Sequence, residues 1–192
     1  LTIYAKAEFT NPSGSIKDRL ALSILLDARN RGLLRPDSVI LECTSGNTGI
    51  SLAMVGTALG YRVRILMSEN ASVERRHLMR HLGAEIELFR PVRGYLTGIE
   101  LSRRQAAADP RIFLPRQFEN PLNALDHEEH TGPEIIAQMK TVDAFVSGYG
   151  TGGTLTGCGR ALKRHHPAVQ IVAMEPAEAA MLSGESPCCH SI

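Results

Sequence analysis

The clearest strand–turn–helix unit of the chain is residues 39–60, VILECTSGNTGISLAMVGTALG. The apolar run Val39–Cys43 has the length and the residue types of a short buried strand. A turn of small residues follows it, and residues 48–59 are predicted as a helix because Gly60 supplies a C-terminal stop signal. A strand that leads through a short turn into a helix is the repeating unit of an α/β fold.

The same alternation of strand and helix continues on both sides of this unit. The other predicted strands are residues 2–7, 62–67, 85–89, 112–114, 144–147 and 170–174. The other predicted helices are residues 16–28, 72–82, 97–108, 132–139 and 154–164. This pattern predicts open, mostly parallel sheets with helices on both faces. Such sheets bind ligands at the carboxyl ends of their strands. The polar segment 115–130 is predicted as a loop.

The composition excludes several classes of function. The chain has 192 residues, of which 43% are hydrophobic and 21% charged, as in ordinary globular proteins. With a net charge of +1, it offers no basic surface to nucleic acid or to an anionic membrane. It has no Trp to stack on single strands. No apolar run approaches the ~20 residues of a membrane span, and we expect no secretory signal.

The cysteines and histidines predict no metal site. Cys43, Cys158, Cys188 and Cys189 form no CxxC pair, and no histidine stands at zinc-ligand spacing from them. His127 and His130 would share a face only if their segment were helical, and they lack an evident third ligand. Unpaired cysteines are typical of a reducing compartment, so we expect a cytoplasmic protein.

The first motif with chemical potential is NPSGSIKDR, residues 11–19. Its turn-forming residues precede a helix, and Lys17 lies in the first turn of that helix. Unpaired N–H groups and the helix dipole disfavour a cation there. A lowered pKa would suit Lys17 to act as an amine nucleophile. The alternative is a solvated surface lysine, which is the usual state of lysine.

Two further turns connect a predicted strand to a predicted helix. The first is TSGNTG, residues 44–49, whose backbone N–H groups can bind a carboxylate or phosphate, although a plain N-cap turn is the alternative. The second is GYGTGGT, residues 148–154, a glycine-rich loop suited to a phosphate. It also satisfies G-x-G-x-x-G, with Glu175 at the distance of a dinucleotide fingerprint. A dinucleotide-binding interpretation would leave residues 11–19 and 44–49 without a role.

Together these segments resemble the fold-type II pyridoxal-phosphate enzymes, and most closely the cysteine synthase (O-acetylserine sulfhydrylase) group. Residues 11–19 resemble the cofactor-lysine motif of the family, residues 44–49 its substrate loop and residues 150–154 its phosphate loop. Further matches, in the order that the family has, are residues 72–76, 117–121, 131–135, 175–176 and 182–184.

The resemblance implies a tryptophan-synthase-β-like fold with two subdomains. Residues 13–120 would form the smaller one, which carries the substrate loop. Residues 1–12 and 121–192 would form part of the larger one, which carries the cofactor phosphate. The larger subdomain is expected to be incomplete, because the family continues beyond the position of Ile192.

The resemblance also implies a cofactor and the residues that hold it. Lys17 would bind pyridoxal 5'-phosphate (PLP) covalently and then serve as the general base. The substrate carboxylate would be held by Thr44, Ser45, Asn47, Thr48 and Gln117. Asn47 would also contact the cofactor ring. The cofactor phosphate would be held by Gly150, Thr151, Gly152, Gly153 and Thr154.

The implied reaction is a β-replacement that forms L-cysteine from O-acetyl-L-serine, or another activated serine, and sulfide, in a homodimer. A cystathionine β-synthase or diaminopropionate synthase type of enzyme is an alternative, because these enzymes share much of the motif set. A dinucleotide-binding oxidoreductase and an inactive truncated module are two further alternatives. The sequence departs from the family pattern at His130 and at residues 186–190.

Overall fold

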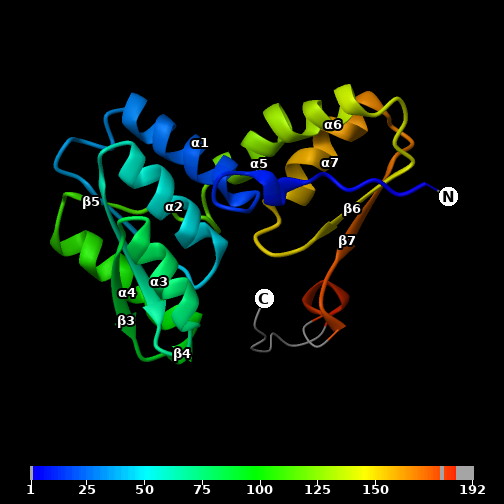
Figure 1. Ribbon diagram of the computed structural model, residues 1–192. Coiled ribbons are helices and arrows are strands. Elements are labelled where there is room, and N and C mark those ends of the chain that lie inside the picture. Colours follow the sequence, from blue (N-terminus) through cyan, green and yellow to red (C-terminus); the bar gives the residue numbers. More distant parts are fainter. Residues whose placement is uncertain (1, 178–179, 185–192) are drawn as a thin grey trace. The chain divides into compact units, whose positions relative to one another are not determined.

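The computed structural model describes residues 2–177 and 180–184 (Figure 1). The chain divides into two compact units, Leu1–Gln117 and Phe118–Ile192. The departures expected at residues 186–190, and the pair Cys188 and Cys189, lie outside the described residues. The assignment of residues 1–12 to the larger subdomain stays a prediction.

The first unit is built on a parallel sheet of four strands in the order β3-β2-β1-β5. The strands are β1 (Val39–Cys43), β2 (Arg62–Ser68), β3 (Glu85–Phe89) and β5 (Ile112–Phe113). Central strand β1 is buried along its whole length. The sheet confirms the α/β fold that the alternation of elements predicts.

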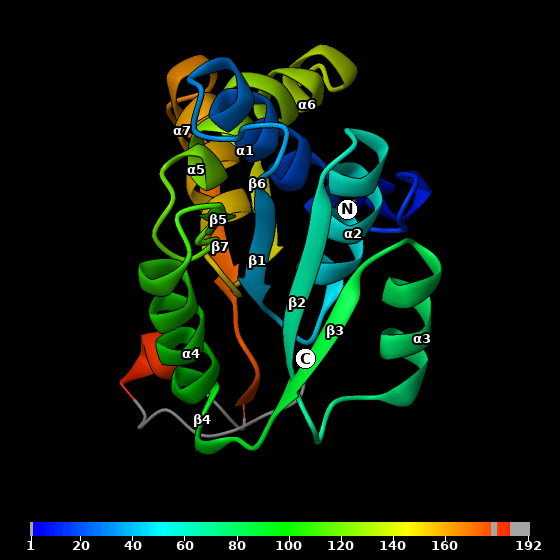
Figure 2. The ribbon, with the colours of Figure 1, turned by 90° about the vertical axis from the view of Figure 1, so that its left-hand side faces the viewer.

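Helices cover both faces of this sheet (Figure 2). They are α1 (Lys17–Asn30), α2 (Asn47–Ala58), α3 (Val73–His81) and α4 (Tyr95–Ala108). Ile40 and Ile65 pack into one core cluster with residues of α1, α2 and α3. Their sequence neighbours Leu41 and Leu66 pack into a second cluster with α4. Successive side chains of a strand point to opposite faces, which explains the two clusters.

The second unit has a parallel pair of strands, β6 (Ala144–Gly148) and β7 (Gln170–Met174). Its core cluster includes Ile135, Cys158, Leu162 and Val169. Its helices are α5 (Leu122–Asp126), the π-helix η2 (His127–Thr131), α6 (Gly132–Gln138) and α7 (Gly153–His165). The short elements of the chain are η1 (Glu8–Thr10), β4 (Val92–Gly94) and η4 (Met181–Ser183). No helix of the described residues is long and apolar enough to cross a bilayer.

Two of the predicted elements are wrong. Residues 2–7 form no strand, and their carbonyls instead serve local turns, such as that closed by the Thr10 N–H on the Ala7 carbonyl at 3.1 Å. Segment 115–130 is not one loop, since it contains α5 and most of η2. The Asn120 side chain caps α5 by accepting the Leu122 N–H at 3.1 Å. Packing against α7 stabilises both short helices, and such packing leaves no local period in the sequence.

Candidate active site

Lys17 is the first residue of α1, after a turn in which Gly14 has a φ of 85°. The Lys17 N–H donates to Ser15 Oγ at 3.2 Å, which fixes the start of the helix. Burial lowers the pKa of the Lys17 ammonium, because a charged amine loses hydration there. Within the described part of the chain, no carboxylate or carbonyl pairs with this ammonium. Lys17 therefore has the environment of a reactive amine.

The turn before Lys17 is tied to helix α2. Asp18 is 8% exposed and accepts the Ser13 N–H at 2.8 Å and also the Ser13 hydroxyl. The hydroxyls of Ser13 and Ser51 lie 2.9 Å apart. Since Ser51 belongs to α2, these contacts hold the start of α1 against the helix whose first turn is residues 47–49. The first two sequence motifs therefore lie close together in the first unit.

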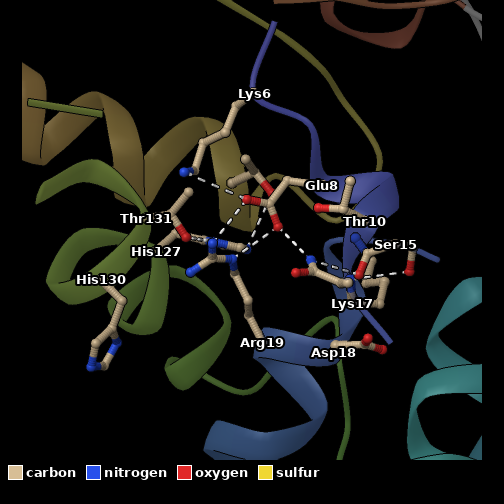
Figure 3. Close-up of polar contacts among 12 residues, drawn as sticks. Lys6, Glu8, Thr10, Ser15, Lys17, Asp18, Arg19, His127, His130 and Thr131 are labelled. Atoms are coloured by element: carbon tan, nitrogen blue, oxygen red, sulfur yellow. Dashed lines mark hydrogen bonds and ion pairs between the residues drawn. The ribbon is translucent and has the colours of Figure 1, made fainter. Parts of the chain in front are cut away.

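A second polar cluster braces the same turn from the N-terminal side (Figure 3). Glu8 accepts hydrogen bonds from Arg19 Nε and Arg19 Nη2, both at 2.9 Å. Asn11 Nδ2 donates to Glu8 at 2.6 Å and to the Ser15 carbonyl at 3.1 Å. Burial alone would raise the pKa of Glu8, but the hydrogen bonds from Arg19 and Asn11 outweigh it and lower the pKa. The cluster links residues 8 and 19 across the lysine turn.

We expect Glu8→Gln to destabilise the protein by about 1 kcal/mol near neutral pH, because it removes a charge-assisted pair. The folded pKa of Glu8 is lowered, so its contribution is present above the unfolded value of about 4.3 and is lost as the pH falls. Urea midpoints of the wild type and the variant should therefore differ near pH 7 and converge at an acidic pH below the lowered pKa of Glu8. A difference that is equal at both pH values would contradict this role.

Residues 44–46 connect the carboxyl end of β1 to α2, and residues 47–49 form the first turn of that helix. Thr44 and Thr48 are each 5% exposed, whereas Asn47 is exposed. Thr48 Oγ1 donates to Gln117 Oε1 at 2.6 Å, which joins two of the predicted substrate residues. The Ser45 carbonyl accepts from Arg75 Nη1 at 3.3 Å. The structure thus brings together the predicted binding residues of the first unit.

A residue of strand β1 holds the segment that carries Gln117. Arg116 has a φ of 54°, which is uncommon for a residue other than glycine. Its N–H donates to Glu42 Oε2 at 2.8 Å, and Glu42 is a buried residue of β1. Sequence analysis missed Glu42, Arg75 and Arg116, because their contacts join segments far apart in the chain.

Removing the Thr48 hydroxyl tests the link to Gln117. Thr48→Val keeps the shape but loses the buried hydrogen bond, so we expect stability to fall by about 1–2 kcal/mol. The Michaelis constant should also rise for the amino acid that the family resemblance implies as substrate. Thr48→Ser is the matched control because it keeps the hydroxyl and should restore most of both losses. Urea denaturation and steady-state kinetics measure the two effects, and a Ser variant as impaired as the Val variant would argue against the hydrogen bond.

The glycine-rich loop of the second unit runs from the end of β6 into α7, which begins at Gly153. Gly152 has a φ of 81°, a left-handed conformation that glycine adopts without strain. Over residues 2–177 and 180–184, no acceptor is found for the N–H groups of Gly150, Thr151 and Gly152. These three groups lie just before α7, and such N–H groups at the start of a helix are suited to bind an anion.

Two buried side chains contact the threonines of this loop. Asn123 Nδ2 donates to Thr151 Oγ1 at 2.9 Å. His127 Nε2 lies 3.2 Å from Thr154 Oγ1. In the part of the chain that the structure describes, no group of three possible ligands could hold a metal ion, and His127 instead contacts hydroxyls. The sequence signal for these contacts was weak, since Asn123 and His127 fall in the segment predicted as a loop.

The dinucleotide interpretation needs a carboxylate that can bind a ribose. Glu175 instead accepts the N–H groups of Leu182 and Ser183 at 2.7 and 3.1 Å. It also accepts the Ser183 hydroxyl at 2.8 Å. The hydrogen bond from the Leu182 N–H is the largest cause of a lowered pKa at Glu175. Glu175 thus closes a local turn, which argues against the dinucleotide interpretation.

Comparison with known proteins decides the family. A model of the family described as pyridoxal-phosphate dependent enzyme matches residues 1–188. The chain belongs to this family. It is 44% identical over 192 residues to a cysteine synthase of Staphylococcus aureus, and the match covers 99% of the chain and 62% of that protein. It is 49% identical over 184 residues to an O-ureido-L-serine synthase of Streptomyces lavendulae, covering 95% of the chain and 56% of that protein.

The solved structures of other family members agree with the fold. The crystal structure of a hydrogen sulfide-producing enzyme from Fusobacterium nucleatum matches with a TM-score of 0.94 at 38% identity. The match covers 99% of the chain and 59% of that structure. The chain thus spans about three fifths of the length of the relatives it matches, and the fold-type II assignment from sequence is confirmed.

The residues of the chain fit the cofactor of the family. Covalent attachment of an aldehyde requires an amine that can lose its proton, and loss of hydration lowers the pKa of the Lys17 amine. A phosphate needs convergent donors without other partners. Within the described residues, the amides of Gly150, Thr151 and Gly152 have no other acceptor and lie next to one another in the chain, which suits them to this role.

Proposed function

We propose that the protein is a PLP-dependent β-replacement enzyme that forms L-cysteine from O-acetyl-L-serine, or another activated serine, and sulfide. The observation that carries the proposal is the half-buried Lys17 at the start of α1, whose pKa is lowered by loss of hydration, in a chain of this family. When bound, PLP supplies an electron sink for charge that develops at the substrate α-carbon.

Lys17 has two roles in this proposal. Its amine attaches the cofactor, and in the reaction its Nζ accepts the proton from the α-carbon of the substrate. An amine can accept a proton only in its neutral form. The burial that lowers the Lys17 pKa raises the neutral fraction, which suits the residue to work near neutral pH.

Residues 44–49 and Gln117 bind the carboxylate of the amino acid in this proposal. The hydroxyls of Thr44 and Ser45 and the amides at the start of α2 supply hydrogen-bond donors. The Thr48 hydroxyl gives its one proton to Gln117 Oε1, so Thr48 contributes its backbone N–H. Exposed Asn47 can reach beyond the loop, which suits it to contact the cofactor ring as well. The hydrogen bond from Thr48 to Gln117 Oε1 holds the Gln117 side chain in place before the substrate binds.

The cofactor phosphate is assigned to Gly150, Thr151, Gly152, Gly153 and Thr154. This assignment is supported by the N–H groups of Gly150, Thr151 and Gly152, which have no acceptor within the described residues, and by the start of α7, where the helix dipole favours negative charge. A homodimer and a cytoplasmic location are further proposals, which sedimentation velocity and cell fractionation would test.

The 49% identity to an O-ureido-L-serine synthase supports hydroxyurea as a second candidate nucleophile beside sulfide. The oxygen of hydroxyurea would form a bond to the β-carbon of O-acetyl-L-serine in place of the acetate, which leaves, and the product would be O-ureido-L-serine. The purified protein should be offered O-acetyl-L-serine with sulfide, with hydroxyurea, or with both, and the products identified by mass spectrometry. We expect cysteine as the main product of the mixture. O-ureido-L-serine as the main product would replace the proposed nucleophile, and no turnover of any activated serine would overturn the β-replacement itself.

A further inference from the structure

The hydrogen bonds of the two threonines in the glycine-rich loop determine what those hydroxyls can offer a ligand. A hydroxyl has one proton to donate and two lone pairs that accept. Thr151 Oγ1 accepts from Asn123 Nδ2 at 2.9 Å and from the Gly153 N–H at 3.4 Å. Both lone pairs are therefore engaged, and the Thr151 hydroxyl keeps only its proton to give.

A buried histidine contacts the Thr154 hydroxyl. His127 is 1% exposed, and its Nε2 lies 3.2 Å from Thr154 Oγ1. The other ring nitrogen, Nδ1, lies 2.9 Å from Thr131 Oγ1 (both residues are labelled in Figure 3). A neutral imidazole carries one proton, so its two nitrogens have opposite roles. If Thr131 donates to Nδ1, then Nε2–H donates to Thr154, and the Thr154 proton is turned toward a ligand.

The packing around these side chains leaves them little freedom. A Cβ on Gly153 would lie 2.1 Å from Asn123 Oδ1, and a Cβ on Gly157 would lie 2.6 Å from the His127 Cβ. Helix α7 therefore approaches α5 and η2 at glycines, and this close approach brings Asn123 and His127 to the loop. π-Helical segments such as η2 occur often at functional sites.

We propose that Asn123 and His127 are positioning residues that, by donating to Thr151 and Thr154, turn both hydroxyl protons toward an anionic phosphate. His127 then exists as the Nε2–H tautomer. The inference rests on the proposed assignment of this loop to the cofactor phosphate. It adds a physical reason for the loop to prefer a phosphorylated ligand over the same ligand without its phosphate.

The tautomer can be measured directly. Long-range ¹H–¹⁵N spectra of the purified holoprotein distinguish the two neutral tautomers of a histidine, and the signals of His127 can be assigned by their loss in His127→Gln. We expect the Nε2–H form. The Nδ1–H form would overturn the proposal, because Thr154 would then have to donate to the ring. The tautomer itself is read from the wild-type spectrum, and His127→Asn can replace His127→Gln for the assignment where the latter fails to fold.

Two substitutions of His127 separate its two contacts. In His127→Gln the terminal amide can take the place of Nε2 and donate to Thr154. In His127→Asn the shorter amide can take only the place of Nδ1, toward Thr131. The apoprotein prepared from each holoprotein is titrated with PLP and, separately, with pyridoxal, which lacks the phosphate. The ratio of the two dissociation constants reports the phosphate contact and is internal to each variant.

We expect His127→Asn to reduce the preference for PLP over pyridoxal by roughly tenfold, as for a lost hydrogen bond to a charged group. We expect His127→Gln to keep most of it and Asn123→Leu to reduce it to a similar extent as His127→Asn. An unchanged preference in His127→Asn would overturn the positioning role. A wild-type protein without any preference for the phosphorylated compound would instead overturn the proposed function.

Discussion

Lys17→Ala is expected to abolish covalent attachment of PLP and to slow cysteine formation by roughly 10²–10⁴-fold, the usual contribution of a positioned general base. The physical reason is that Lys17 combines a lowered pKa with the absence of an anionic partner in the described residues. The measurement is the visible absorption of the purified protein, together with the mass of the cofactor-bearing peptide after reduction with borohydride. In the wild type, the mass of the reduced cofactor should be found on the peptide that contains Lys17.

Two variants serve as controls for Lys17. Lys17→Arg keeps length and positive charge, but a guanidinium stays protonated, so it should be as inactive as the alanine variant. Lys140 is an exposed lysine of the second unit, and Lys140→Ala should keep both the absorption and the rate. A cofactor mass found on another lysine, or an unchanged visible band in Lys17→Ala, would remove Lys17 from its role.

Local signals in the sequence were sufficient to predict most elements of the fold. Strands β1, β3 and β7 have the predicted bounds. The helix predicted over residues 72–82 is capped at its first residue, where Ser72 Oγ accepts the Arg75 N–H at 3.3 Å. These features depend on short apolar runs, caps and glycine stops, which act within a few residues. They are therefore visible without any knowledge of the partner segments.

The features that the sequence did not predict depend on distant contacts. Helix α5 and η2 are short, and they owe their stability to α7, more than twenty residues later in the chain. The same holds for the candidate site. The glycine-rich loop is evident from its composition, whereas the contacts of Asn123 and His127 with it exist only in the folded unit. Their residue types alone carried no signal for that role.

The second large effect is expected from a glycine substitution in helix α7. Gly157 lies against backbone atoms of α5 and η2, whereas Gly159 lies against a side chain. A Cβ on Gly157 would lie 2.2 Å from the Ala124 carbonyl oxygen and 2.8 Å from the Glu128 nitrogen. Backbone atoms cannot rotate away as a side chain can, so Gly157→Ala must push α7 from α5 and η2. We expect a loss of about 2–3 kcal/mol in unfolding free energy, measured from urea midpoints.

Gly159→Ala is the matched control in the same helix. Its nearest neighbours would be side-chain atoms of Ile171, the closest at 3.3 Å, which can shift slightly. Alanine favours a helix over glycine by up to about 1 kcal/mol, so this variant should be neutral or more stable than the wild type. The sign of the difference between the two variants thus isolates close packing from helix propensity. If Gly157→Ala were as stable as Gly159→Ala, α7 could not approach η2 as closely as the contact between His127 and Thr154 requires.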